Sequence, residues 1–380
     1  MKYYIIAGEA SGDLHGSNLI KSLSKLDDKI EVRAWGGDLM QDAGAKIVKH
    51  YRELAFMGFI EVVKNLGTIL KNISFCKQDI IEFKPDVLIL IDYPGFNLRI
   101  AKWAKSKGIK VVYYISPQIW AWKENRINTI KSSVDKMLVI LPFESEFYKK
   151  WNYHVDYVGH PLVEVVDSFI QNQTTPRKNW ESRSIIGILP GSRKQEINIK
   201  LPIMLEVAKQ LPEYQFVVGK APGIEDAFYD DLLKDLKNVS TLKNQTYNLL
   251  YGAKAALVTS GTATLETALF DVPQIICYKG NSISYEIAKR IIKIKYIGLV
   301  NLIIEKPVVK ELIQNDLTAE NIIAELKQIL DTPTKQNQIF EDYATLKTLL
   351  ATGGNASKNA AEIIFNYLNK TAISSKVVSQ

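Results

Sequence analysis

The sequence predicts an α/β protein with parallel sheets in two domains. Short apolar runs, which indicate buried strands, alternate with segments of helical spacing along most of the 380 residues. Such alternation favours a parallel sheet covered by helices on both faces. The length indicates two domains, and the polar stretch 171–179 is rich in residues that avoid packing. We therefore predict one domain over residues 1–170 and a second over residues 180–349.

The composition is that of a soluble globular protein, with 47% hydrophobic and 23% charged residues. The net charge of +7 fits a nucleic acid, an anionic membrane surface or a phosphorylated substrate, and does not choose among them. The two cysteines are far apart and form no CxxC motif, which indicates a reducing compartment. The N-terminal strand lacks the apolar core of a signal peptide, and no run of about 18 apolar residues could span a membrane.

Strands in the first half are expected at residues 3–7, 32–35, 87–91, 111–115, 136–141 and 155–158. Polar or aromatic side chains follow three of these strands. Glu9, Ser11 and Asp13 come after the first strand, Asp92 after the third, and the tryptophan-containing segment 116–122 after the fourth. Because ligands bind at the carboxyl ends of parallel strands, these segments are candidates for a site.

Asp92 is the candidate general base. A carboxylate directly after a buried strand, held by a Pro-Gly turn, is well placed to accept a proton. The alternative is that Asp92 only caps the next helix. For Trp120 and Trp122 two roles stay open, the lining of a pocket and packing in the core.

Between the second and third strands, the segment 56–73 carries an apolar stripe at helical spacing. The stripe is wider than one packing face needs, and lysine and arginine side chains are interspersed. Such a surface suits acyl chains and anionic head groups, whereas the commoner explanation is a helix that faces the core. The residues assigned to acyl-chain or membrane contact are Met57, Phe59, Val62, Val63, Leu66, Ile69 and Leu70.

Strands in the second half are expected at residues 185–189, 216–219, 256–259 and 274–278. The first of these ends in a Gly-Ser turn, which is followed by Arg193, Lys194 and a segment of helical spacing. Backbone N–H groups at the start of a helix favour an anion, which leads to the hypothesis that a diphosphate binds here. An ordinary turn with solvated basic residues is the alternative.

A second turn of this kind contains Ser260, Gly261 and Thr262, which expose backbone and hydroxyl donors at a helix start. Glu266 lies about one turn inside the helix. Its carboxylate could accept hydrogen bonds from a ribose diol, or it could act only on the helix dipole. Asn301 is expected to make a further polar contact.

No motif in the sequence predicts a metal or a cofactor. The four histidines show no metal-ligand spacing, and a P-loop lysine motif, a GxSxG elbow and a DxD carboxylate pair are absent. A diphosphate leaving this site would therefore be stabilised by protein cations and helix ends.

Several short motifs, in one order along nearly the whole chain, resemble those of the lipid-A-disaccharide synthases, a family of bacterial glycosyltransferases. The matching segments are 8–13 (GEASGD), 56–58 (FMG), 84–86 (KPD), 91–94 (IDYP), 116–122 (SPQIWAW), 141–144 (LPFE), 159–161 (GHP), 189–193 (LPGSR), 260–266 (SGTATLE) and 301–302 (NL).

The resemblance implies a GT-B fold, in which two Rossmann-like domains face each other across a cleft and a final helix, here at about 350–370, crosses back onto the first domain. It also implies the reaction. The family moves 2,3-diacylglucosamine from UDP-2,3-diacylglucosamine to the 6-hydroxyl of 2,3-diacylglucosamine 1-phosphate, with inversion and release of UDP, and without a cofactor. A cytoplasmic protein that binds peripherally to an anionic surface, the cytoplasmic face of the inner membrane, is expected, and a homodimer is left open.

The motif match also implies roles for single residues. Asp92 is the general base, and Arg193 contacts the diphosphate. Gly95 departs from the family pattern, which often has a second acid at that position. Any catalytic role of Asp92 in this chain must therefore work without a second acid three residues later. Contacts with the sugar cleft are implied for Glu9, Ser11 and Asp13, and contacts with UDP for Ser260, Gly261, Thr262, Glu266 and Asn301.

Two rival functions stay open. Another GT-B enzyme, such as a UDP-N-acetylglucosamine 2-epimerase or the peptidoglycan N-acetylglucosaminyltransferase, also uses UDP-sugars, but the epimerase needs no lipid acceptor. A non-catalytic nucleic-acid binder would gather its cations with exposed aromatic side chains on one face. Here the lysines are scattered and no arginine-rich segment is present, so no nucleic-acid partner is expected.

Overall fold

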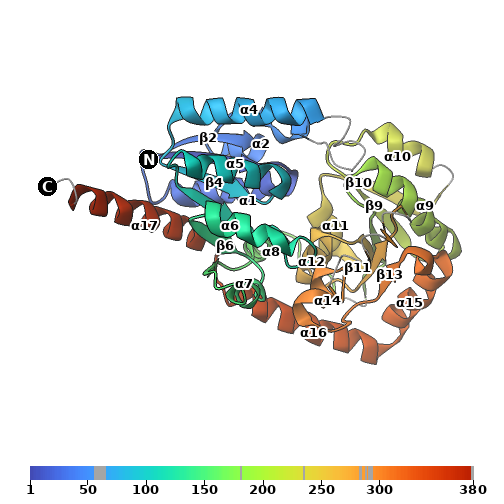
Figure 1. Cartoon of the computed structure of the whole chain (residues 1–380). Helices are drawn as coiled ribbons and strands as arrows, with labels where there is room; N and C mark the ends of the chain where they lie inside the picture. The colour runs from blue at the N-terminus through green and yellow to red at the C-terminus, as the bar shows by residue number, and fades with distance from the viewer. Residues whose placement is uncertain are drawn as a thin grey trace. The chain divides into compact units, whose positions relative to one another are not determined.

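The computed structural model describes residues 1–54, 66–179, 182–233, 236–281, 285–286, 289 and 294–377. The chain divides into two compact units (Figure 1). The first comprises Met1–Pro161 together with Leu350–Gln380, and the second comprises Leu162–Leu349.

The first unit contains a parallel sheet with the strand order β3-β2-β1-β4-β5-β6-β7. Its strands are β1 (Lys2–Ala7), β2 (Glu31–Gly36), β3 (Lys46–His50), β4 (Val87–Ile91), β5 (Val111–Tyr114), β6 (Lys136–Val139) and β7 (Asp156–Tyr157). Its helical segments are α1 (Ala10–Leu23), α2 (Asp38–Asp42), η1 (Tyr51–Leu54), α4 (Leu66–Phe83), α5 (Pro94–Ser106), η2 (Glu124–Arg126), α6 (Ile127–Ser133), α7 (Glu144–Lys149) and α17 (Ala356–Val377).

Helices cover both faces of this sheet, as its sequence pattern predicts. Successive residues of a strand point to opposite faces, so Tyr4 and Ile6 of β1 join one core while Tyr3 and Ile5 join the other. The first of these cores is completed by α4, α5 and α6, and the second by α1 and α17. Strands buried on both faces have continuous apolar sequences, which is why β1 and β4 could be located from sequence.

The final helix α17 belongs to the first unit, as the family resemblance implies. Ala356, Ala360 and Ala361 are small enough to let this helix approach α1 closely, and all three are buried. The chain enters α17 through another close contact, because a Cβ added to Gly353 would lie 2.2 Å from the Cα of Gly159. Packing on α1 thus returns the C-terminal segment to the N-terminal sheet.

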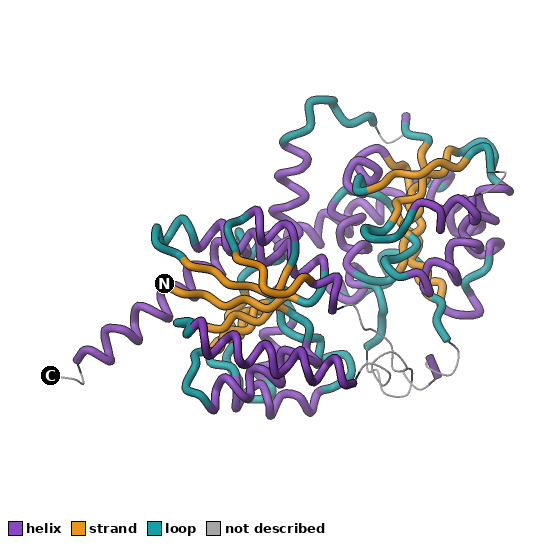
Figure 2. The backbone as a smooth tube through the Cα atoms, turned by 90° about the horizontal axis from the view of Figure 1, so that it is seen from above, coloured by secondary structure: helices purple, strands orange, loops and turns teal. Residues whose placement is uncertain are grey.

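The second unit contains its own group of strands, drawn in orange in Figure 2. They form a parallel sheet with the order β10-β9-β8-β11-β12-β13. Its strands are β8 (Ile185–Leu189), β9 (Gln215–Lys220), β10 (Val239–Lys243), β11 (Ala253–Thr259), β12 (Gln274–Tyr278) and β13 (Glu311–Ile313). Its helical segments are α8 (Pro161–Gln171), α9 (Lys194–Gln210), α10 (Asp226–Leu233), α11 (Thr246–Gly252), α12 (Thr262–Leu269), α14 (Leu299–Ile304), η4 (Gln314–Asp316), α15 (Ala319–Asp331) and α16 (Pro333–Ala351).

The polar stretch 171–179 is not where the two units divide. The sequence places α8 in the first domain, but the structure places it in the second unit from Leu162 onward. Phe169 of α8 explains this assignment, because its ring lies 5.4 Å from the ring of Tyr247 and 5.7 Å from that of Phe270. Aromatic contacts of this kind add to the burial of the rings and hold α8 on the second unit.

The predicted fold class, α/β with two parallel sheets, is confirmed. Three strands that the sequence did not predict, β3, β10 and β13, all lie at sheet edges. Each is only partly buried, so none of them has the continuous apolar run that identifies a central strand.

In each sheet the strand order reverses at one place. The reversal lies between β1 and β4 in the first unit and between β8 and β11 in the second. The carboxyl ends of the strands at such a reversal leave a crevice between the loops, and ligands of open α/β sheets bind there.

Candidate active site

Two of the predicted carboxylates follow neighbouring strands at the reversal in the first unit. β1 pairs with β4 so that Ala7 lies opposite Ile91. Glu9 and Asp92 therefore leave the sheet from adjacent strands at the same edge. Gly8, between them, is covered by an aromatic ring, since a Cβ at this position would lie 2.4 Å from Cγ of Tyr93. A glycine is thus required at this point.

Asp92 lies in a strained turn that its neighbours hold in place. Its φ is 45° and that of Tyr93 is 47°, a region that residues with a Cβ seldom adopt. The carbonyl oxygen of Asp92 accepts hydrogen bonds from Nδ2 of Asn97 at 2.8 Å and from Oη of Tyr113 at 2.5 Å. Pro94 then begins α5 with a φ suited to a helix. These contacts keep Asp92 in place at the end of β4.

The electrostatic surroundings of Asp92 suit a proton acceptor. The residue is exposed to solvent, yet enough protein surrounds its carboxyl that desolvation is the largest effect on it. Desolvation, followed by the negative charge of Glu9, raises the pKa of Asp92 to about 7, and the backbone N–H of Tyr93 offsets part of this rise. A carboxylate with a pKa near the working pH can both take up and release a proton.

The other two predicted residues of this region differ from Asp92. Ser11 is half-buried in the first turn of α1. Asp13 is buried, and its carboxylate accepts backbone N–H bonds from Gly37 at 2.7 Å, Leu39 at 3.1 Å and Met40 at 3.1 Å. These bonds satisfy the start of α2, so Asp13 positions the loop after β2.

A cavity of about 240 Å³ lies at the reversal in the second unit. β8 pairs with β11 so that Leu189 lies opposite Val258, and the loops after these two strands form the walls. The cavity is lined by Leu189, Gly191, Ser192, Glu196, Gly219, Lys220, Ala221, Pro222, Thr246, Thr259, Ser260, Gly261, Thr262, Ala263 and Glu266.

Cations lie beside the glycine turn at the start of α9. Nη1 of Arg193 pairs with Oε1 of Glu196 at 3.2 Å. Lys200 is 2% exposed, and its Nζ lies 3.9 Å from the other oxygen of Glu196. Burial lowers the pKa of Lys200, and the charge of Glu196 opposes this shift. Glu196 therefore stabilises both cations next to Gly191, whose φ of 124° lets the backbone turn toward the cavity.

The turn after β11 presents backbone donors, and the exposed Thr262 lines the cavity beside them. Oγ of Ser260 donates to the carbonyl of Ile297 at 2.9 Å, so this hydroxyl is engaged within the protein. Gly261, with a φ of 153°, precedes α12, and the first N–H groups of a helix have no partner inside it. Glu266 in this helix accepts a hydrogen bond from Oη of Tyr247 at 2.9 Å. Burial raises the pKa of Glu266, and the Tyr247 hydrogen bond offsets part of the rise.

Asn301 does not line the cavity. It is buried, and its amide bonds both backbone groups of Val309, with Nδ2 donating to the carbonyl at 2.8 Å and Oδ1 accepting the N–H at 3.0 Å. Nδ2 also donates to Glu311, which accepts the backbone N–H of Ile297 at 3.0 Å. Through this network Asn301 positions the segment that holds Ser260, and it acts on the cavity only indirectly.

The family model described as Lipid-A-disaccharide synthetase matches residues 3–365. The chain belongs to this family. Two relatives, both lipid-A-disaccharide synthases, are 40% identical. The protein of Geobacter metallireducens aligns over 373 residues, which are 96% of this chain and 97% of the relative. That of Syntrophus aciditrophicus aligns over 375 residues, which are 97% and 98% of the two chains. Because lipid-A-disaccharide synthases are glycosyltransferases, the chain is an enzyme of that class.

Solved structures with the same fold include enzymes of other families. The UDP-GlcNAc 2-epimerase from Neisseria meningitidis bound to UDP-GlcNAc superposes with a TM-score of 0.64 at 17% identity, over 97% of this chain and 100% of the epimerase. The calicheamicin glycosyltransferase CalG4 gives 0.60 at 14% identity, over 98% and 99% of the chains. At these identities the likeness shows the GT-B fold, which this member of the lipid-A-disaccharide synthase family therefore has.

The structure adds cavity residues that sequence reasoning missed. Glu196, Lys220, Thr246 and Thr259 all line the cavity. The available signal was position, since each lies at the end of a strand or in the first turn of a helix at the carboxyl edge of the sheet. Oγ1 of Thr259 is buried and has no hydrogen-bond partner within the described ranges, so it can accept one from a bound molecule.

Only part of the predicted apolar stripe can be placed. Met57, Phe59, Val62 and Val63 lie outside the described residues, and α4 begins at Leu66. Ile69 packs against the first core, so this position of the stripe faces inward. Leu70 is 53% exposed and faces solvent. None of the helices in the described part of the chain is both long enough and apolar enough to cross a membrane.

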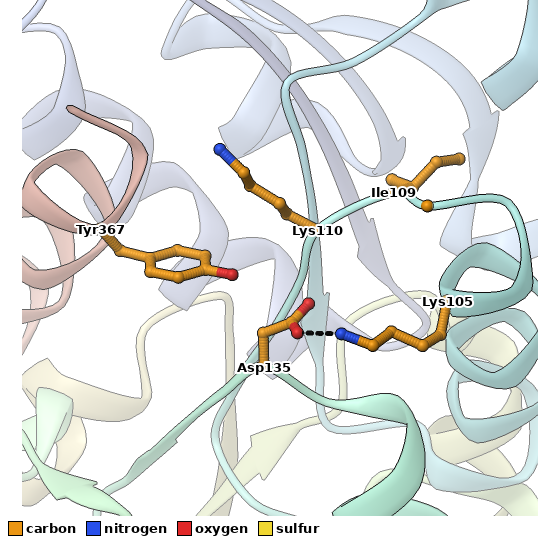
Figure 3. A pocket seen from close by; sticks show the side chains of 6 residues that line it. Lys105, Ile109, Lys110, Asp135 and Tyr367 are labelled. Atoms are coloured by element: carbon orange, nitrogen blue, oxygen red, sulfur yellow. Dashed lines mark hydrogen bonds and ion pairs between the residues drawn. The ribbon is translucent and has the colours of Figure 1, made fainter. Parts of the chain in front are cut away.

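A second, smaller cavity lies at the amino edge of the first sheet (Figure 3). Lys110 and Asp135 directly precede β5 and β6, which places this cavity at the end of the strands opposite to Asp92. Asp135 pairs with Lys105 and accepts the backbone N–H of Val111, and the ammonium of Lys110 lies 5.7 Å from the ring centroid of Tyr367 in α17. The contact between Lys110 and Tyr367 joins α17 to this edge of the sheet. Within the described ranges no group of three His, Cys, Asp or Glu side chains is arranged to hold a metal ion.

Proposed function

We propose that the chain transfers 2,3-diacylglucosamine from UDP-2,3-diacylglucosamine to the 6-hydroxyl of 2,3-diacylglucosamine 1-phosphate, with inversion at the transferred sugar. Membership of the lipid-A-disaccharide synthase family supports the reaction. The observation that carries the mechanism is the pairing of chemistries at the two strand-order reversals. One presents a carboxylate with a pKa near 7, and the other presents helix starts and cations beside a cavity.

In the proposed step, the 6-oxygen of the acceptor attacks C1 of the donor sugar as the bond from C1 to UDP breaks. Asp92 takes the proton of the attacking hydroxyl, and the bonding electrons leave with UDP. A single displacement of this kind inverts the configuration at C1. Exposure of Asp92 to solvent means that a hydroxyl can reach it, and its raised pKa matches proton uptake at neutral pH.

In the same proposal, the cavity of the second unit binds UDP. Arg193 and the first N–H groups of α9 and α12 would stabilise the charge that develops on the departing diphosphate. Glu266, already oriented by Tyr247, would accept hydrogen bonds from the ribose hydroxyls. The proposed leaving-group stabilisation uses protein groups alone, so turnover should survive treatment with EDTA, and strict dependence on added metal would contradict it.

The deciding experiment measures UDP release in detergent micelles from UDP-2,3-diacylglucosamine, with and without 2,3-diacylglucosamine 1-phosphate. Release that requires the acceptor and yields a disaccharide 1-phosphate by mass is expected. Conversion of UDP-N-acetylglucosamine without any lipid acceptor would instead support an epimerase-like activity on the same fold, which also occurs among the enzymes that share this fold.

We further propose that the protein binds the cytoplasmic face of the inner membrane through the outer face of α4. Leu70, Phe75 and Ile81 of this helix are 53%, 46% and 54% exposed, and Lys71 is exposed among them. An apolar helix face with cations binds at the boundary of anionic lipid.

Leu70→Ser with Ile81→Ser should lower sedimentation with anionic vesicles, whereas Leu26→Ser with Leu349→Ser, at positions 37% and 36% exposed, should not. Equal binding by both double variants would overturn the assignment to α4.

A further inference from the structure

The tryptophan-containing segment 116–122 has no role in the mechanism above, although it leaves the sheet beside Asp92. β4 pairs with β5 so that Ile91 lies opposite Tyr114. Asp92 and Ile115 are therefore the first residues beyond two neighbouring strands, at the same edge of the sheet. Ile115 has a φ of 66°, which is rare for a β-branched residue and turns the chain sharply at this point.

Hydrogen bonds of Ser116 and Trp120 anchor the segment. The hydroxyls of Ser116 and Tyr148 are hydrogen-bonded at 2.7 Å, and both residues are buried. Nε1 of Trp120 donates to Oε1 of Glu144 at 3.2 Å, and the other oxygen of Glu144 accepts the backbone N–H of Leu141 at 2.9 Å. Trp120 is half-buried, and this bond from its indole fixes the loop to Glu144.

Trp122 has the opposite environment. It is 48% exposed and follows directly after this anchored loop. Two cations flank its indole, with Nζ of Lys123 at 4.1 Å and Cζ of Arg126 at 5.7 Å from the ring centroid. Partial burial, and after it the charge of Arg126, lowers the pKa of Lys123. The two positive charges are therefore held close enough to repel each other.

No ion pair compensates these charges among the residues that the structure describes. Neither Lys123 nor Arg126 forms an ion pair there. Elsewhere in the first unit, cations that lie close to an acid are common, as in the pairs Lys105–Asp135 (Figure 3), Arg52–Asp38 and Lys136–Asp156. Glu124 lies between these cations in sequence but pairs with neither of them, and two adjacent cations outside any ion pair form a site that an anion would stabilise.

Arg126 is also connected to the candidate base. Burial, and then the charge of Asp92, raises the pKa of Tyr113 well above its usual range, and the charge of Arg126 opposes this rise. The Oη of the same Tyr113 donates to the carbonyl of Asp92. The charge of Arg126 thus acts on the hydroxyl that holds the strained turn of Asp92, and both the anion site and Asp92 follow strands that are neighbours in the sheet.

We propose that Trp122, Lys123 and Arg126 form the subsite for the phosphate of the acceptor lipid. This inference rests on the proposed function and names what fixes the acceptor. In 2,3-diacylglucosamine 1-phosphate the phosphate on C1 lies across one sugar ring from the 6-hydroxyl, so a site that holds the hydroxyl at Asp92 must hold the phosphate close by. A guanidinium binds two phosphate oxygens at once, an ammonium adds a point charge, and an indole offers an apolar surface to the sugar ring.

The test compares two acceptors, 2,3-diacylglucosamine 1-phosphate and the same lipid without its phosphate, in detergent micelles. For the unaltered chain, loss of the phosphate should lower kcat/KM for the acceptor by about 10- to 100-fold, the range expected for hydrogen bonds to a charged group. Arg126→Ala and Lys123→Ala should lower kcat/KM for the phosphorylated acceptor and leave that for the other lipid nearly unchanged. Arg126→Lys, which keeps the charge, should retain part of the preference.

Two further measurements separate this role from others. Lys107→Ala removes an exposed cation after α5 and should leave the phosphate preference intact. UDP affinity, measured by calorimetry, should be unchanged in every variant that folds. If Arg126→Ala and Lys123→Ala keep the preference of the unaltered chain, the subsite is wrong, and if they lose vesicle binding instead, these cations serve the membrane. If the unaltered chain shows no acceptor-dependent release of UDP at all, it is the proposed function that fails.

Discussion

The two strand-order reversals of this protein have the same architecture and opposite chemistry. In each unit the first strand of the sheet pairs with the strand at which the order reverses, and the loops beyond both strands carry the candidate site. In the first unit these loops contribute the carboxylates Glu9 and Asp92. In the second unit they contribute helix starts and Arg193, and α9 adds a buried lysine, Lys200.

This difference shows how one supersecondary arrangement serves two parts of a transfer reaction. The sheet determines where a ligand can bind, because the strand ends and the loops after them converge at the reversal. The residues placed just after the strands determine which ligand binds there. Acids at this edge can take a proton, and cations and N–H groups at the same edge can stabilise an anion.

The two sites also differ in how their backbone conformation is maintained. Asp92 and Tyr93 have positive φ although both have a Cβ, and hydrogen bonds from Asn97 and Tyr113 hold their turn. In the second site the positive φ values fall on glycines, Gly191 and Gly261, which adopt them without such strain. The first site therefore depends on its neighbouring side chains more than the second does.

The largest effect should come from Asp92→Asn. Asparagine tolerates positive φ as aspartate does, so the turn should persist while the proton acceptor is lost. Loss of a positioned base lowers turnover by about 100- to 10,000-fold. UDP affinity should not change, because the proposed UDP site lies in the other unit. Asp42→Asn, at an exposed carboxylate in α2, is the matched control, and turnover near that of the control would remove Asp92 from the role of base.

Arg193→Ala should have the second-largest effect and should show the opposite pattern. Loss of charge-assisted hydrogen bonds to the diphosphate is expected to weaken UDP binding by roughly 10- to 100-fold, as calorimetry would measure. Lys194→Ala is the control, because Lys194 is exposed and pairs with Glu225 at 2.7 Å. Equal losses in the two variants would mean that the turn attracts UDP only through its general positive charge.

Sequence reasoning placed the candidate residues of both sites correctly at strand ends, because strand ends can be predicted from apolar runs. β4 (Val87–Ile91) and β8 (Ile185–Leu189) are buried along nearly their whole length, so apolar runs alone assign the residues after them to the carboxyl edge of a sheet. Asp92 and Arg193 both follow from this reasoning. Their predicted catalytic and binding roles await the measurements described above.

The partners of polar side chains could not be predicted in this way. Asp13 accepts a hydrogen bond from the backbone N–H of Gly37, which lies far from it in sequence. Asn301 donates a hydrogen bond to Glu311, which belongs to another element. A polar residue near a strand end has the same sequence signature whether it binds a ligand or a neighbouring loop. Only the fold shows which donors and acceptors are already satisfied.

The pH dependence of kcat/KM tests whether the two acids of the first site are coupled. Asp92 must be ionised to accept a proton, so activity should fall as the pH drops below the raised pKa of about 7. Glu9→Gln removes the nearby negative charge and should move this acidic limb to lower pH. If the pKa of Asp92 fell by about one pH unit, the relative rate at about pH 6 would rise roughly fivefold. The position of the limb is the readout, since a lost substrate contact would change only its height.

An unmoved acidic limb in Glu9→Gln would mean that burial alone raises the pKa of Asp92. The second site provides the contrast, because Glu266 also has a pKa raised by burial but accepts a proton from no substrate in the proposed step. Glu266→Gln should therefore leave the limb where it is and weaken UDP binding.

The smallest effect is expected from Gly95→Asp, which adds the second acid that many family members have. Gly95 is exposed in the first turn of α5, and a Cβ added there would meet no heavy atom within 4 Å among the described residues. This turn has no acidic residue, so an aspartate should stabilise the helix by about 0.3–1 kcal/mol, as thermal unfolding would show. Its charge should also raise the pKa of Asp92 and move the acidic limb to higher pH, opposite to Glu9→Gln.

Gly95→Ala separates the loss of glycine from the added charge. If activity falls at the same acidic pH in Gly95→Asp and Gly95→Ala, an acid at position 95 does not act on the pKa of Asp92. Asp92 can then serve as the base without the second acid that many family members have.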